Sequence, residues 1–185
     1  MKKGKLFVIS GPSGVGKDTI IREYLKNNKG LLSISATTRK KRDNEENGKD
    51  YYFLTKKEFE KWIEEDNFLE YAIYNDNYYG TPKSKIEENL LNGINVFLVI
   101  EVQGAFQIKS KIKDSILIFI LPPDLKTLEE RLKNRKTETQ EMIENRLKIA
   151  VEEIKLAPKY DYNITNNKIE TSVEKLKMII QNESN

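Results

Sequence analysis

The chain has 185 residues, of which 38% are hydrophobic and 33% are charged, and its formal net charge is +3. This composition is typical of one globular domain and excludes a disordered or membrane-embedded chain, while the small net charge gives no indication of a nucleic-acid binder. The chain contains neither cysteine nor histidine, which excludes disulfides, zinc sites, thiol nucleophiles and histidine acid/base chemistry.

The first predicted element is a short buried strand over residues 6–9, and similar apolar runs follow at 96–100 and 116–121. All three runs are too short for a signal peptide or a membrane span, so we expect a cytoplasmic protein. Helical patterns separate the runs. This alternation predicts an α/β fold, in which a parallel sheet is covered by helices on both faces.

The first strand leads into GPSGVGKDT, which fits the phosphate-binding loop pattern G-x-x-x-x-G-K. Gly11, Gly14 and Gly16 allow successive backbone N–H groups to face an anion at a helix N-terminus, and Lys17 adds a positive charge. An amphipathic pattern begins near Lys17 and predicts the helix that this motif requires. The residues predicted to bind a nucleoside triphosphate are Gly11, Pro12, Ser13, Gly14, Val15, Gly16, Lys17, Asp18 and Thr19.

Two regions interrupt the alternation of strands and helices. Residues 33–81 are polar and aromatic, and they predict a small mixed α+β lobe with strand-like pieces and a helix opened by a capping box of Thr55 and Glu58. Residues 124–139 contain ERLKNRKTET and have too few apolar residues to bury themselves, which predicts a mobile helical lid, with bounds at 124–146. The remaining segments, 1–32, 82–123 and 147–185, would form the core.

Two amphipathic helices are predicted towards the C-terminus. One lies between Thr139 and Ala157 and ends at Pro158. The other begins with a capping box of Thr171 and Glu174.

Several separated stretches together resemble guanylate kinase over nearly the whole chain. They are GPSGVGKDT, SISATTRKKRDNEENGKDYYF, FLEYAIYNDNYYGTPK, IEVQGA and ERLKNRKTETQEMIENRL, in the order and at the spacing of that family. The resemblance implies a P-loop NTPase core, an inserted nucleotide-monophosphate-binding lobe and a lid. It implies transfer of the γ-phosphoryl group of ATP to GMP with Mg²⁺, and no nucleic-acid or membrane partner. It leaves the oligomeric state open.

The resemblance places the GMP phosphate on Arg39, Arg42, Tyr51 and Tyr79. Two guanidinium groups and phenol donors suit a phosphate dianion, because charge-assisted hydrogen bonds are strong and bidentate. Without the resemblance, the two arginines would be interpreted as part of a solvated basic run, RKKR.

The resemblance assigns guanine recognition to Glu70, with Ser35, Thr81 and Glu101 around it. Guanine presents N1–H and N2–H₂ side by side, and one carboxylate accepts both, whereas the bare N1 of adenine would repel it. A site of this kind discriminates by ~10⁴ or more against an analogue that lacks the donors. The family usually has Asp where this chain has Glu101. It often has an acidic residue where this chain has Val99, so this chain offers no carboxylate for a metal ion at that position.

The resemblance gives catalytic roles to Lys17, Arg131, Arg135 and Arg146, whose guanidinium groups would reach the transferring phosphoryl group when the lid closes. Asn166 would contact ATP on the adenine side.

Asp18 occupies the position where Ser or Thr usually holds magnesium. Resemblance to nucleoside monophosphate kinases whose loops read GKGT assigns the phosphate contact to Thr19 instead. We expect Asp18 in the first helical turn, where the helix dipole favours a carboxylate, and meeting Mg²⁺ through water.

Two alternatives stay open at this point. Another P-loop kinase, such as one that phosphorylates a ribose bisphosphate, can also carry GKD followed by a hydroxyl residue. A guanylate-kinase-like domain can also serve as an inactive interaction module. The complete glycine pattern and Lys17 favour an enzyme, and Glu70 with its polar neighbours favours GMP.

Overall fold

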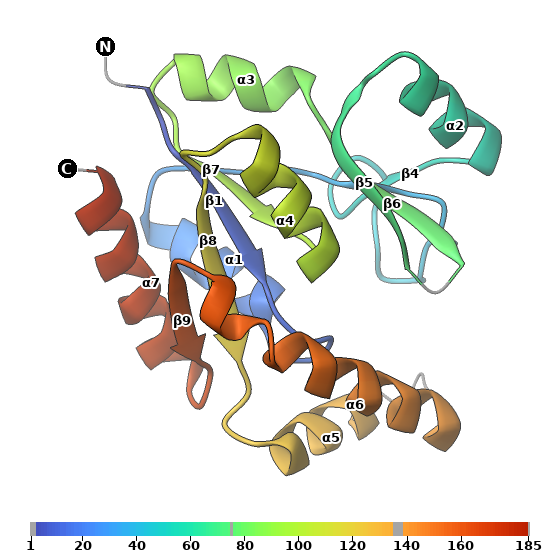
Figure 1. Ribbon diagram of the computed structural model, residues 1–185, viewed down its shortest axis with the longest axis vertical. Helices are drawn as coiled ribbons and strands as arrows, with labels where there is room; N and C mark the ends of the chain where they lie inside the picture. The colour runs from blue at the N-terminus through green and yellow to red at the C-terminus, as the bar shows by residue number, and fades with distance from the viewer. Residues whose placement is uncertain (1–2, 75, 135–138, 185) are drawn as a thin grey trace.

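A five-stranded parallel sheet lies at the centre of the computed structural model, which describes residues 3–74, 76–134 and 139–184 (Figure 1). The strand order is β2-β7-β1-β8-β9. The strands are β1 (Leu6–Ser10), β2 (Leu31–Leu32), β7 (Val96–Val99), β8 (Ile116–Leu121) and β9 (Tyr162–Thr165). The three predicted apolar runs are therefore confirmed as neighbouring parallel strands.

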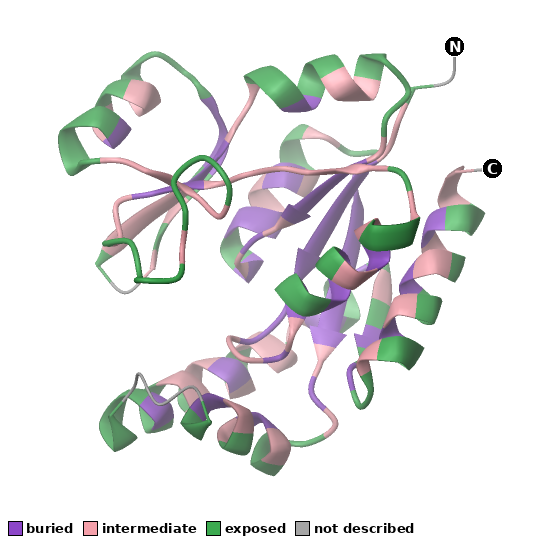
Figure 2. Ribbon diagram, turned by 180° about the vertical axis from the view of Figure 1, so that it is seen from behind, coloured by how far each residue is buried: buried purple, intermediate pink, exposed green. Residues whose placement is uncertain are grey.

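Helices cover both faces of this sheet. Helices α1 (Lys17–Asn27) and α7 (Ile169–Ser184) pack on one face, and α3 (Ser84–Leu91) and α4 (Val102–Lys111) pack on the other. Successive residues of β1 alternate between these two hydrophobic cores, with Phe7 in the first and Val8 in the second. The three inner strands, β7, β1 and β8, are buried on both faces (Figure 2), which explains why they are continuous apolar runs rather than alternating patterns.

A second sheet is mixed and has its own small core. Its order is β4-β3-β6-β5, with β3 and β4 parallel and the other pairs antiparallel. Its elements are β3 (Ala36–Thr37), β4 (Tyr52–Phe53), α2 (Lys56–Glu64), β5 (Phe68–Tyr74) and β6 (Asn77–Pro82). Phe59 of α2 stacks on Phe68 with ring centroids 4.4 Å apart. The capping box of Thr55 and Glu58 opens α2 as predicted.

Helices α5 (Leu125–Lys133) and α6 (Gln140–Ile154) lie beyond the carboxyl ends of the central strands (Figure 1). The prediction that this segment has too few apolar residues to bury itself is wrong. Leu128 and Leu132 of α5 and Ile143 of α6 are buried in the same core as α1 and α7. The apolar side of α5 therefore packs beside the phosphate loop, where the side chain of Leu132 lies against Gly14.

Two predicted helix boundaries differ from the structure. Helix α6 ends at Ile154, and Pro158 lies in a separate 3₁₀ turn, η1 (Ala157–Lys159). Helix α7 begins at Ile169, so the capping box predicted from Thr171 and Glu174 is wrong; the Thr171 hydroxyl donates to the Lys168 carbonyl instead, at 2.9 Å. Among the described residues, no helix is both long enough and apolar enough to cross a membrane.

Candidate active site

The phosphate loop joins β1 to α1 and holds two glycines in the left-handed region. Gly14 and Gly16 have φ angles of 85° and 98°, which favour glycine over other residues. The Lys17 Nζ donates to the carbonyls of Gly11 at 2.5 Å and Pro12 at 3.1 Å, and only 9% of the residue is exposed. The lysine charge is therefore held within the loop at the start of a helix, which is where a phosphate binds.

A cleft of about 260 Å³ opens beside this loop. It brings together Lys17 and Asp18 from the start of α1, Arg39 and Arg42 from the segment between β3 and β4, and Arg146 from α6. These residues come from separate parts of the sequence. The charged lining comprises five cationic residues, Lys17, Arg22, Arg39, Arg42 and Arg146, and four acidic ones, Asp18, Glu45, Asp50 and Glu101. Several cationic side chains in one small cleft suit a ligand with phosphate groups.

Glu45 orients the arginines of this cleft, and sequence reasoning missed it. Its carboxylate accepts from both terminal nitrogens of Arg39, at 2.7 and 3.0 Å, and from the backbone N–H of Arg42 at 2.8 Å. Burial by itself would raise the pKa of Glu45, but the hydrogen bonds from Arg39 and Arg42 hold that pKa below its ordinary value. The only signal in the sequence was an acidic residue three positions after Arg42.

Three tyrosines line the cleft opposite the phosphate loop. The Tyr79 ring makes edge contacts with Tyr51 and Tyr74, with ring centroids 6.3 and 6.5 Å apart, and the Arg39 guanidinium lies 5.4 Å from the Tyr51 centroid. Burial raises the pKa of Tyr51 far above its ordinary value and that of Tyr74 to about 12. Both phenols therefore stay protonated near neutral pH and remain hydrogen-bond donors. Tyr74 was not predicted from the sequence.

A narrower hollow of about 40 Å³ shares its wall with the cleft and is lined by Ser35, Glu70 and Glu101. Glu70 lies on β5 and is only 3% exposed, and its Oε1 accepts a 2.5 Å hydrogen bond from the Thr81 hydroxyl on β6. Burial raises the pKa of Glu70 to about 7, although the Thr81 hydrogen bond and the charge of Lys111 act in the opposite direction. The residues predicted to recognise the base, Ser35, Thr81 and Glu101, therefore lie around the buried carboxylate of Glu70.

Gly104 leaves space for that carboxylate and was also missed. It is buried in α4, and a Cβ on this glycine would lie 2.5 Å from Oε2 of Glu70. Glycine in a helix interior costs about 1 kcal/mol relative to alanine, so a packing reason is expected. Here the missing side chain makes room for Glu70.

Glu101 and Val99 both line the cleft and the hollow. Glu101 is the N-cap residue of α4, but its side chain makes no capping hydrogen bond, so it faces the two spaces without serving the helix. Asp18 lies in the first turn of α1, as expected. Within the part of the chain that the structure describes, no group of three or more acidic side chains is placed to hold a metal ion.

Of the residues predicted for the lid and for the adenine side of ATP, only some line the cleft. Arg146 lines the cleft and donates to the Ser13 hydroxyl at 2.6 Å. Arg131 instead donates to the carbonyls of Val15 at 3.3 Å and Asn166 at 3.0 Å, behind the phosphate loop. Asn166 is 1% exposed, so the predicted contact of its side chain with ATP has no support in this geometry. Arg135 lies outside the described residues, and Thr19 is exposed on α1 and outside the lining of the cleft.

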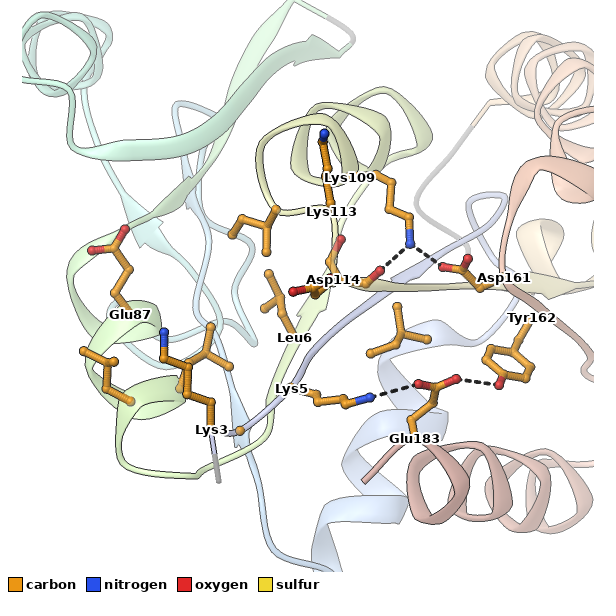
Figure 3. Close-up of a pocket in the computed structure, with 16 residues that line it drawn as sticks. Lys3, Lys5, Leu6, Glu87, Lys109, Lys113, Asp114, Asp161, Tyr162 and Glu183 are labelled. Carbon is orange, nitrogen blue, oxygen red and sulfur yellow. Dashed lines mark hydrogen bonds and ion pairs between the residues drawn. The ribbon is translucent and has the colours of Figure 1, made fainter. Parts of the chain in front are cut away.

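Another hollow, of about 1050 Å³, lies at the other end of the sheet, and Figure 3 shows the side chains that line it. Four of its charged side chains form two ion pairs, with Lys5 bonded to Glu183 at 3.2 Å and Lys109 to Asp161 at 2.9 Å. In open parallel sheets, ligands bind at the carboxyl ends of the strands, whereas this hollow borders the start of β1 and β8. We therefore assign the functional site to the smaller cleft beside the phosphate loop.

The chain matches a family model described as guanylate kinase over residues 3–183. It is 50% identical over 183 residues to a guanylate kinase of Clostridium tetani, covering 99% of this chain and 88% of that protein. It is also 50% identical over 186 residues to a guanylate kinase of Clostridioides difficile, covering 100% of this chain and 91% of that protein.

Solved structures agree with these comparisons. The crystal structure of guanylate kinase from Anaplasma phagocytophilum superposes with a TM-score of 0.85 at 34% identity, covering 99% of this chain and 87% of that one. A shikimate kinase from Bacteroides thetaiotaomicron, with a TM-score of 0.51 and 17% identity, shares only the α/β kinase fold. Since the family model and the relatives at half identity both span nearly the whole chain, the chain belongs to the guanylate kinase family.

Proposed function

We propose that this guanylate kinase transfers the γ-phosphoryl group of ATP to GMP, giving ADP and GDP, with ATP on the phosphate loop and GMP in the adjoining cleft and hollow. One observation carries this assignment of sites. Lys17 of the loop and the Arg39–Arg42 pair face the same cleft, and that cleft continues into the hollow of Glu70. Donor and acceptor phosphates would therefore meet between them. The cytoplasmic location expected from the sequence belongs to the same proposal.

The GMP phosphate would bind to Arg39, Arg42 and the tyrosines. Arg39 has five N–H donors, of which one bonds to the carbonyl of Lys40 and two to Glu45. Two donors are left for a phosphate, and Glu45 holds the guanidinium plane in place while they bind. Tyr51 and Tyr79 would add phenol donors from the side of the lobe.

The chemical step needs charge neutralisation and alignment more than proton removal. A phosphate monoester is largely dianionic near neutral pH, so its oxygen can attack without a protein base. Lys17 and Arg146 would neutralise charge on the transferring group. Mg²⁺ would neutralise the triphosphate when bound, and Asp18 fits it through water, because this ion is usually held by one or two carboxylates together with substrate phosphates. Val99 offers no second carboxylate for that purpose.

The division of the chain follows from these roles. We propose residues 33–81 as the GMP-binding lobe, 124–146 as the lid and the remainder as the core. The separate hydrophobic core of the second sheet supports the first boundary, and the position of α5 and α6 beside the phosphate loop supports the second. Closure of both parts would exclude water that otherwise hydrolyses ATP.

Product analysis tests the proposed reaction. Protein incubated with ATP, GMP and Mg²⁺ should form ADP and GDP in equal amounts, as measured by ion-exchange chromatography. ADP formed without GDP would show hydrolysis of ATP and would count against the proposal.

The raised pKa of Glu70 predicts a pH dependence of base binding. Only the ionised carboxylate accepts from both guanine donors, and this form is lost as the pH falls through about 7. The affinity for guanosine should therefore rise between about pH 6 and about pH 8 and then level off. Guanosine is the suitable probe for isothermal calorimetry because it carries no phosphate that titrates in this range. An affinity that stays constant, or one that falls with pH, would contradict the role given to Glu70.

Gly104→Ala should weaken GMP binding selectively. The new methyl group must displace the Glu70 carboxylate, although alanine itself favours the helix. We expect the KM for GMP to rise about 10- to 100-fold, because small misplacements of binding groups have effects of this size. The KM for ATP should stay unchanged. Gln103→Ala, at an exposed position of the same helix, is the matched control. Equal effects on both substrates would indicate general damage to the fold instead.

A further inference from the structure

The side of the phosphate loop that faces away from the cleft is held by two side chains from other elements, Asn166 and Arg131. The carbonyl of Val15 accepts from the Asn166 side-chain nitrogen at 2.8 Å and from Arg131 at 3.3 Å. Asn166 follows β9 directly, and its backbone N–H donates to the Leu121 carbonyl at 2.8 Å. The end of the sheet and helix α5 therefore both contact one peptide group of the loop.

The hydroxyl of Ser172 orients the Asn166 amide. A carbonyl accepts hydrogen bonds and does not donate them, so the Asn166 atom that faces Val15 must be the NH₂ group. The other end of the amide is then an acceptor, Oδ1, which lies 2.9 Å from the Ser172 hydroxyl. That hydroxyl has one proton and also lies 3.0 Å from the Lys168 carbonyl, but this carbonyl already accepts from the Thr171 hydroxyl and from the Ser172 backbone N–H. The proton of Ser172 is therefore assigned to Asn166 Oδ1. Ser172 is 0% and Asn166 is 1% exposed, so water has no access to replace this donor.

Asn166 also lies against the residue that shapes the loop. A Cβ on Gly16 would lie 2.6 Å from the Asn166 side-chain nitrogen. Gly16 holds a φ of 98° immediately before α1, and its conformation directs the N–H groups that receive phosphate. A movement of Asn166 would therefore change the turn at Gly16 as well as release the Val15 carbonyl.

We propose that Ser172 is a positioning residue for triphosphate binding, which acts by fixing Asn166 against Val15 and Gly16 of the phosphate loop. The inference deepens the proposed function, on which it rests for the location of the triphosphate. It assigns the Asn166 side chain to the loop instead of to the adenine ring. It also gives a function to the first turn of α7, which is remote from the GMP site.

The test compares the binding of ATP with that of inorganic tripolyphosphate, both with Mg²⁺, by isothermal calorimetry. Ser172→Ala should raise the Kd of both ligands by the same factor, about fivefold, which corresponds to the loss of one buried hydrogen bond. Asn166→Asp keeps the acceptor for Ser172 but loses the donor to Val15, and it should weaken both ligands more strongly. The KM for GMP should stay unchanged in both variants.

Thr171→Ala is the matched control. The Thr171 hydroxyl donates to the same Lys168 carbonyl that Ser172 also contacts, at 2.9 and 3.0 Å, but no bond joins it to Asn166. This variant should bind both ligands as the unmodified protein does. If it weakens them as Ser172→Ala does, the effect comes from the helix end and the inference is wrong.

A double-mutant cycle tests whether Ser172 acts through Asn166. Ser172→Ala should have no further effect when Asn166 is already alanine, because the path to the loop is then absent. The inference is overturned if the two effects add, or if Ser172→Ala weakens ATP without weakening tripolyphosphate, which would indicate an adenine contact. These experiments measure the binding of a triphosphate. Failure of the proposed function would be seen in a different experiment, the product analysis, as the absence of GDP.

Discussion

Lys17→Met should lower kcat by about 10²- to 10³-fold, the loss expected when a preorganised donor to a developing negative charge is removed. Methionine is similar in length and keeps the contacts of the side-chain stem, but it removes the ammonium group that lies beside the Gly11 and Pro12 carbonyls. ATP would then bind without that charge at its β- and γ-phosphates. The rate of ADP formation at saturating ATP and GMP measures the effect.

Lys26→Met is the control for this substitution. Lys26 lies in the last turn of the same helix, is exposed and pairs with Glu23 at 2.6 Å. Exposed pairs of this kind contribute about 0–1 kcal/mol to stability, so kcat should not change. A Lys17→Met protein that is folded and retains more than about a tenth of the original kcat would show that this lysine is not part of the catalytic site.

Glu70→Gln should lower kcat/KM for GMP by about 10²-fold and raise the relative use of AMP. The amide accepts through one oxygen only and loses the charge assistance, which is worth about 1.5–3 kcal/mol in a hydrogen bond. Its NH₂ group can donate to the bare N1 of adenine, which the carboxylate repels. The ratio of kcat/KM for GMP to kcat/KM for AMP should therefore fall, because GMP is used less well and AMP is used better. Initial rates with each acceptor, at fixed ATP, give the ratio.

Glu64→Gln serves as the comparison, since Glu64 is an exposed carboxylate at the end of α2 in the same lobe. It should leave the GMP-to-AMP ratio unchanged. If Glu70→Gln also leaves that ratio unchanged, base recognition lies elsewhere in the cleft.

The phosphate loop and the strands beside it could be predicted from the sequence because their signals are local. Continuous apolar runs mark strands that are buried on both faces, and the glycine spacing together with Lys17 marks the loop between β1 and α1. The capping box at Thr55 was also predicted correctly, because its partner is three residues away. The similar pattern at Thr171 failed, since α7 had already begun at Ile169.

The rest of the site depends on contacts that no local pattern carries. Gly104 and Glu70 come from different elements and meet only through packing of α4 on β5. Asn166 and Val15 are 151 positions apart, and the pattern around Asn166 did not show that its side chain is buried against the loop. The resemblance to guanylate kinase supplied candidate residues for the cleft, but it did not indicate Glu45 or Tyr74.

The central claim is that GMP is the acceptor of the phosphoryl group. It is tested most directly by a coupled ADP-release assay of kcat/KM for GMP, AMP, CMP, UMP and a ribose bisphosphate under the same conditions, with ATP and Mg²⁺ fixed. The arrangement of Glu70 in the hollow beside the phosphate-binding arginines predicts a value for GMP that exceeds that for AMP by ~10⁴ or more. No turnover of GMP, or a higher value for any of the other acceptors, would contradict it.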